Sequence, residues 1–171
     1  MVLDITKIEK ATNSIATDLD ALLNSQCKIK DSLLHFSDGK NLKGDELTGW
    51  LGEIFAKILF NGTLVDESHE HDFIVPTSDE KYAVKARKGK NKGWNITSAI
   101  SKIEGGDCPD FLLFIHFDTK YSIESIWKYN WKEILAEKRF KPKKVRGEGN
   151  RWYFQVTPTK DKARLVYSRK T

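Results

Sequence analysis

The sequence is poor in residues that cross-link chains or bind soft metals: it has two cysteines, one methionine and four prolines among 171 residues. Cys27 and Cys108 lie far apart and do not form the C-x-x-C spacing of a zinc site. Two isolated thiols are typical of proteins in a reducing compartment. We therefore expect free cysteines and a cytoplasmic location.

The sequence also has no apolar run of membrane length, and its N-terminal segment carries acidic residues where a signal peptide would be apolar. We therefore expect a soluble protein without a membrane partner. No internal repeat or low-complexity linker divides the chain, so residues 1–171 are predicted to form a single domain. Its parts are N-terminal helices over 1–43, a core over 44–117, and strands, a helix and a basic loop over 118–171.

Charged side chains are abundant and nearly balanced in sign. They make up 31% of the residues, and 29 lysines and arginines against 24 acids leave a net charge of +5. Aromatic residues are 11% of the chain, which argues against disorder. With so small a surplus, the positions of the basic residues are more informative than their number.

The spacing of apolar residues predicts helices in the first third of the chain. An amphipathic pattern covers residues 2–24, with a break near 12–14 left open, and a shorter helix over 29–36 ends at a Ser-Asp-Gly stop signal. The clearest helix spans 44–60 and ends at an Asn-Gly pair. Its apolar arc consists of Leu47, Trp50, Leu51, Ile54, Phe55, Ile58 and Leu59.

The rest of the chain predicts strands interrupted by short helices, and the whole is an α/β fold in which a mixed β-sheet is flanked by helices. Residues 77–80 read as a hairpin turn, and the apolar run 111–117 as the central strand. Strands are predicted over 63–65, 71–75, 81–87, 111–117, 121–127, 151–156 and 164–167, and helices over 97–104 and 131–138.

Alternation along the strands places two chemically active residues on one face of the sheet. Asp72 and Lys85 share the face opposite to the predicted core. The core-facing residues are Phe73, Val75, Tyr82 and Val84, and the opposite face carries Asp72, Ala83, Lys85 and Arg87.

Carboxylates beside a lysine are the groups that metal-assisted hydrolysis of a phosphodiester requires. Mg²⁺ held by carboxylates polarises the phosphate and activates a water, and a lysine orients that water or stabilises the developing charge. Asp72 and the carbonyl of Val84 are candidate metal ligands, with Glu53 supporting them from its helix and Lys85 as the lysine. A solvated Asp and Lys on an exposed strand is the commonplace alternative, and the helix alone favours a solvent-facing Glu53.

The order of these residues resembles the PD-(D/E)-x-K nuclease superfamily, which includes many type II restriction endonucleases. GWLGEIFAKILF resembles the family's first core helix, HDFIVP the strand with its first aspartate, and KYAVKARKG the strand with its lysine. The resemblance covers about residues 44–117 and implies a restriction endonuclease-like core and Mg²⁺-dependent cleavage of double-stranded DNA. It implies catalytic positions at Glu53, Asp72, Ala83 and Lys85, and metal ligands at Asp72, Val84 and Glu53.

Ala83 departs from the family pattern, which has Asp or Glu, or occasionally Gln, two residues before the lysine. Its methyl group cannot bind a metal, so this form is expected to be inactive or impaired. Three explanations compete: an engineered change from Glu or Asp, which the intact flanking residues favour; a natural member with its second carboxylate elsewhere; or a DNA-binding module that has lost catalysis. A junction-resolving or repair nuclease is a further alternative.

Two basic segments fit contacts with DNA phosphates, and aromatic and amide side chains beside them are suited to contacting bases. Solvated lysine-rich loops are the plain alternative. Cleavage of both strands at a symmetric site usually needs a two-fold dimer, so we predict a homodimer. The predicted DNA contacts are Arg87, Lys88, Lys90, Lys92, Trp94, Asn95, Lys143, Lys144, Arg146 and Arg151.

His69 and His71 flank Glu70 in an H-x-H pattern that can chelate a transition metal. Histidines in an acidic loop are more often part of a polar surface. No metal site is therefore predicted at these residues.

Overall fold

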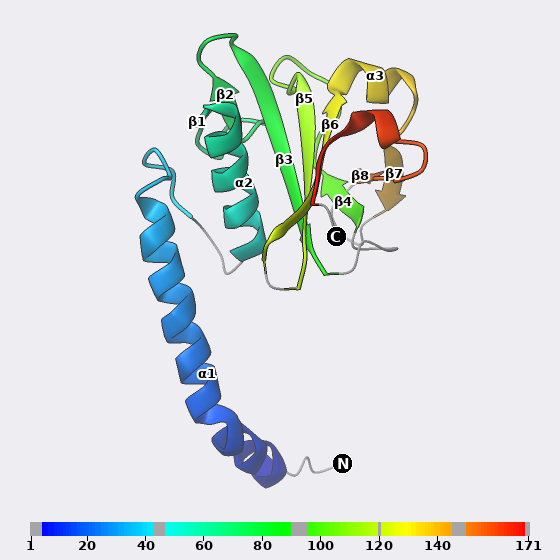
Figure 1. Cartoon of the computed structure of the whole chain (residues 1–171). Helices are drawn as coiled ribbons and strands as arrows, with labels where there is room; N and C mark the ends of the chain where they lie inside the picture. The colour runs from blue at the N-terminus through cyan, green and yellow to red at the C-terminus, as the bar shows by residue number, and fades with distance from the viewer. Residues whose placement is uncertain (1–4, 43–46, 90–95, 120, 145–149, 170–171) are drawn as a thin grey trace.

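The structure is a computed structural model that describes residues 5–42, 47–89, 96–119, 121–144 and 150–169. Its main sheet has the strands β1 (Thr63–Leu64), β2 (Phe73–Val75), β3 (Glu80–Lys88), β5 (Phe111–Phe117), β6 (Ile123–Asn130) and β9 (Leu165–Ser168). They lie side by side in the order β1-β2-β3-β5-β6-β9 (Figure 1). β3 and β5 run parallel and the other neighbours antiparallel, so the predicted α/β class with a mixed sheet is confirmed.

The helix α2 (Leu47–Phe60) covers one face of this sheet (Figure 1). Trp50, Ile54 and Ala56 are buried against the strands, whereas the predicted arc was too wide, because Ile58 and Leu59 are 49% and 54% exposed. Gly52 allows α2 to lie very close to the sheet: a Cβ atom on Gly52 would be only 2.5 Å from the Cβ atom of Ala86 on β3.

The other face of the sheet is covered mainly by a second, three-stranded sheet in the order β4-β8-β7, whose strands are β4 (Thr97–Ile100), β8 (Asn150–Gln155) and β7 (Lys141–Lys144). The predicted helix over 97–104 is therefore wrong: residues 97–100 form β4, and residues 101–104 are not helical. Ser98 and Ile100 are buried opposite Phe154 and Trp152 of β8, and this pairing overrides the weak helical pattern. The basic segment read as a loop likewise contains β7, which pairs with β8.

The core has two parts, one on each face of the main sheet. Phe73, Val75, Tyr82 and Val84 are buried toward α2, as alternation predicts. Ala83 is buried in the other part, so the face expected to be solvated is covered at this position. The short helix α3 (Trp131–Ala136) adds Trp131 and Ile134 to that second part, and the side chain of Asn130 caps its first turn.

Several predicted elements have different ends. β2 begins at Phe73, so Asp72 lies just before the strand and not within it. β6 extends to Asn130, although its predicted pairing with β5 is confirmed. A 3₁₀ turn, η2 (Lys162–Arg164), precedes β9.

The N-terminal region forms one helix, α1 (Ile5–Leu34), where two were predicted. No glycine or proline lies between the two predicted segments, and so nothing in the chain interrupts the backbone hydrogen bonds. Positive φ angles at Asp38 and Gly39 then turn the chain at the predicted stop. Within the described ranges, no helix combines the length and the apolarity needed to cross a membrane.

Candidate functional site

The candidate site lies along a stretch of one edge of β3 that has no neighbouring strand among the described residues, which we call the open edge. β2 pairs with β3 only from Glu80 to Tyr82, although β3 continues to Lys88. Asp72 occupies the start of this edge: its backbone N–H donates to the Tyr82 carbonyl at 2.8 Å, and its Oδ2 accepts from the Val84 N–H at 2.7 Å. Both backbone groups of a strand residue point to the same side, so the Val84 carbonyl faces the open edge as well.

A second carboxylate and a lysine meet Asp72 at this edge. Glu53 is presented by α2, and its side chain is only 23% exposed, so it is not the solvent-facing glutamate that the helix pattern favoured. The Nζ atom of Lys40 lies 2.8 Å from Oε2 of Glu53 and 3.8 Å from Oδ1 of Asp72. Lys40 is 9% exposed and serves both carboxylates.

Sequence reasoning missed Lys40 because no spacing rule connects it to the site. It follows the turn at Gly39 and reaches Glu53 across 13 residues of chain. Only the packing of the segment before α2 against that helix brings the ammonium group to the carboxylates.

The electrostatics of the two acids are only partly balanced. Burial raises the pKa of Glu53 above its ordinary value, and the neighbouring Asp72 carboxylate raises it further. Lys40 and Lys85 lower the pKa of Glu53, but by less. The site therefore favours an added positive charge, or a proton, next to Glu53.

Lys85 reaches the same region from the middle of β3. It lines a cleft of about 1420 Å³ together with Glu53, and it contributes to the electrostatic field at Glu53. Lys40, Glu53 and Asp72 line a smaller hollow of about 220 Å³, so Glu53 borders both spaces. The larger cleft extends between α1, the start of α2, β3 and the second sheet.

Ala83 lies away from these two spaces, in an apolar environment. It is 4% exposed and belongs to the buried cluster that contains Ile96, Leu112 and Phe114. A carboxylate at this position would have to enter that cluster. These surroundings argue against the explanation that Ala83 replaces a native Asp or Glu.

The predicted DNA contacts fall into three groups. Arg87 ties β3 to β4, since its Nε and Nη2 atoms donate to the Thr97 carbonyl and the Ser98 hydroxyl, each at 3.0 Å. Lys88 lies 3.7 Å from the centre of the Tyr121 ring, and the exposed Arg151 lines the large cleft. Lys143 and Lys144 belong to β7, but their side chains lie outside the described part. Also outside the described residues are Lys90, Lys92, Trp94, Asn95 and Arg146.

The folded chain thus brings Glu53, Asp72 and the Val84 backbone to one edge and adds Lys40 to them, whereas Lys85 lines the neighbouring cleft beside Glu53. No protein-family model and no curated protein matches this chain. The functional proposal is accordingly made from the geometry and chemistry of this edge.

Proposed function

We propose that this protein is a Mg²⁺-dependent DNA endonuclease of the type II restriction class, with impaired activity because Ala83 offers no metal ligand. The observation that carries the proposal is the pair of carboxylates, Glu53 and Asp72, held around one ammonium group at the open edge of β3. Mg²⁺ is usually bound through one or two carboxylates, and these two lie close enough together to share one cation.

The donor set fits Mg²⁺. The ligands would be the Asp72 and Glu53 carboxylates and the Val84 carbonyl, all hard oxygen donors, and Mg²⁺ commonly uses one or two carboxylates and keeps several waters. When bound, the ion would polarise a phosphoryl oxygen and lower the pKa of a water. A divalent ion among these oxygens requires the Lys40 ammonium to move from Glu53, because like charges repel.

The protein groups have separate roles in this proposal. Lys85, on the cleft side of Glu53, stabilises negative charge that develops on the phosphate or orients the attacking water. The raised pKa of Glu53 reflects uncompensated negative charge, which suits this carboxylate to holding a cation. Lys88 and Arg151 line the same cleft and are placed for contacts with the DNA backbone.

A second candidate function is non-catalytic DNA binding on the same fold. It is favoured by Lys40, which already compensates part of the carboxylate charge, and by Ala83, which adds no carboxylate. In that case the cleft would bind DNA in a salt-dependent manner, and Mg²⁺ would change nothing.

Cleavage of both DNA strands at a symmetric site would further imply a homodimer. Exposed apolar side chains on α1 are candidate contacts: Leu22 is 60% exposed and Leu23 is 56% exposed. Sedimentation of the full chain, compared with its Leu22→Gln/Leu23→Gln variant, tests this. A monomeric full chain would remove the dimer from the proposal.

The test of the function is incubation of supercoiled plasmid with the full chain, with and without Mg²⁺. We expect slow Mg²⁺-dependent nicking or linearisation that is lost in Asp72→Asn. The matched control is Asp79→Asn, which removes the same charge from an exposed turn whose φ of 56° asparagine tolerates. Salt-dependent DNA binding without cleavage, unchanged by Mg²⁺, would establish the non-catalytic function instead.

A further inference from the structure

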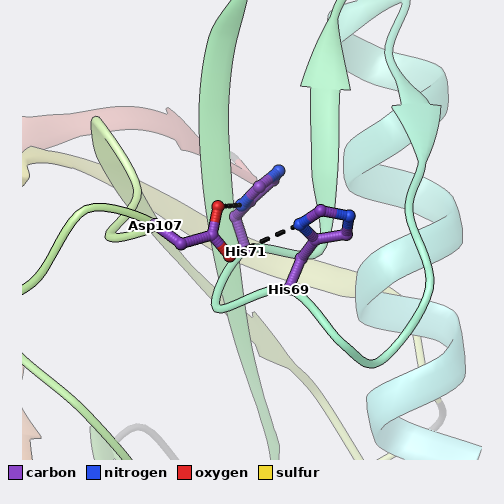
Figure 2. A group of neighbouring side chains, drawn as sticks. All are labelled: His69, His71 and Asp107. Atoms are coloured by element: carbon purple, nitrogen blue, oxygen red, sulfur yellow. Dashed lines mark ion pairs between the residues drawn. The ribbon is translucent and has the colours of Figure 1, made fainter.

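Three side chains that the proposed hydrolysis does not use converge between two loops (Figure 2). His69 and His71 come from the loop between β1 and β2, and Asp107 from the loop before β5. The Nδ1 atom of His69 lies 3.4 Å from Oδ2 of Asp107, and Nδ1 of His71 lies 3.5 Å from its Oδ1. One potential ligand atom from each residue lies within 4.8 Å of the other two.

His71 is not part of a polar surface, contrary to the expectation from its acidic loop. Its side chain is 1% exposed, whereas that of His69 is 43% exposed. Among the described residues, Nε2 of His71 has no hydrogen-bond partner, and Nδ1 has only the 3.5 Å approach to Oδ1 of Asp107, which is not a hydrogen bond. A buried imidazole normally satisfies its polar atoms, and so this ring lacks an interaction that a ligand would supply.

We infer that His69, His71 and Asp107 form a binding site for a divalent transition metal, best fitted by Zn²⁺. Two imidazole nitrogens and one carboxylate oxygen are among the donors that zinc uses, with bonds of about 2.0–2.2 Å. Ligand atoms on a tetrahedron of that size are separated by about 3.4 Å. Nδ1 of His69 and Nδ1 of His71 lie 3.4 and 3.5 Å from the two different oxygens of Asp107, and one ligand atom of each residue lies within 4.8 Å of the others, so small side-chain rotations would bring the three onto such a tetrahedron.

The surroundings hold the carboxylate in place for this role. Oδ2 of Asp107 accepts from the Glu70 backbone N–H at 2.9 Å, and Oδ1 lies 3.5 Å from Nζ of Lys81. Such hydrogen bonds orient a metal-binding carboxylate. Three protein ligands leave one tetrahedral position for water, and His69 gives this position access to solvent.

The site has a consequence for the fold that does not depend on the proposed nuclease function. A bound metal would connect the loop that contains His69 and His71 to the loop that contains Asp107. Asp72 directly follows His71, so the metal would also restrain the backbone of the acidic edge. Imidazole ligands select zinc over magnesium, so this site is chemically distinct from the one at Glu53 and Asp72.

The test uses the tag-free full chain with Zn²⁺ alone, followed by titration calorimetry and thermal denaturation. We expect one zinc per chain, a higher melting temperature with zinc, and tetrahedral absorption bands when Co²⁺ replaces it. His69→Asn and Asp107→Asn should each weaken binding about tenfold or more. Two controls should retain binding: His35→Asn, which removes an exposed histidine on another segment, and Cys108→Ser, which removes the thiol next to Asp107.

Zinc binding and DNA cleavage can be tested separately. Asp72→Asn should abolish cleavage and leave the zinc stoichiometry unchanged. The metal site is overturned if the full chain binds no zinc at micromolar concentration, or if His69→Asn binds as tightly as the unmodified chain. Loss of binding in Cys108→Ser would overturn this ligand set.

Discussion

Two groups of buried charges in this protein differ in how completely they are compensated. At the acidic edge, Lys40 is the one cation among the described residues that pairs with both Glu53 and Asp72. Near the C-terminus, a single carboxylate, Asp161, is 1% exposed and receives hydrogen bonds from four directions. Its donors are Arg139 through both Nη atoms, the Tyr129 hydroxyl and the Thr157 N–H, at 2.7–2.9 Å.

The pKa values of Asp161 and Glu53 shift in opposite directions. Burial raises the pKa of Asp161, but its hydrogen bonds to Arg139, Thr157 and Tyr129 outweigh that effect and lower it overall. The pKa of Glu53 is raised, because burial and Asp72 outweigh the lysines. An acid whose negative charge is fully balanced by its hydrogen bonds stabilises the fold. An acid whose charge is only partly balanced can still bind a ligand. This contrast separates a structural cluster from a candidate functional one.

The largest expected effect is at the compensated cluster. Asp161→Asn removes the charge that pairs with Arg139 and leaves that guanidinium partly buried, so the free energy of unfolding should fall by about 4 kcal/mol at pH 7. Urea denaturation measures the change, with Asp79→Asn as the control for an exposed aspartate. If the free energy of unfolding falls by less than about 1 kcal/mol, the Asp161 cluster and the acidic edge are alike in their contribution to stability.

The pH dependence of this cluster has a defined sign. The folded pKa of Asp161 lies below its unfolded value of about 3.9, so its stabilisation is complete above that value and is lost as the pH falls through the folded pKa. The difference in stability between the unmodified chain and Asp161→Asn should therefore be constant from pH 5 to 7 and shrink toward pH 3. An unchanged difference at pH 3 would contradict the assignment.

The next effect concerns the position beside the acidic edge. Ala83→Glu places a carboxylate in the apolar cluster with Leu112 and Phe114, and should lower the free energy of unfolding by about 3 kcal/mol. The matched variant Ala83→Val adds volume without charge and should cost less. If Ala83→Glu instead keeps its stability and cleaves plasmid DNA with Mg²⁺, the position is a ligand position after all.

Lys40→Met tests the shared cation directly. Removal of the ammonium leaves the Glu53 and Asp72 carboxylates facing each other, and should cost about 2 kcal/mol at pH 7. Mg²⁺ should restore more of the melting temperature in this variant than in the unmodified chain, because the ion no longer competes with the lysine. The control is Lys132→Met at an exposed position of α3. Equal Mg²⁺ responses would contradict the proposed metal ligands.

The smallest effect is expected for Glu53→Gln. The raised pKa of Glu53 means that its charge is unfavourable in the folded state, so removing the charge should raise the free energy of unfolding slightly at pH 7. The gain should disappear as the pH falls below about 4.3, where the carboxyl is protonated in both states. Destabilisation at pH 7 would show that the Lys40 ion pair outweighs the burial of Glu53.

Sequence reasoning succeeded where local periodicity determines the structure. Alternation placed Phe73 and Tyr82 in the core, and helical spacing located α2. It failed for β4, because the strand conformation of Thr97–Ile100 depends on pairing with β8, which follows about fifty residues later. The contacts of Lys40 with Glu53 and of Asp107 with His71 likewise join segments that no local pattern relates.

The contact between Gly52 and Ala86 also has a consequence for comparing this protein with others. The separation between α2 and β3, and with it the reach of Glu53 toward Asp72, depends on a missing methyl group. This spacing carries no charge and no hydrogen bond, so a search for polar residues does not detect it. Two chains with the same glutamate, aspartate and lysine could therefore differ in activity through this one small residue.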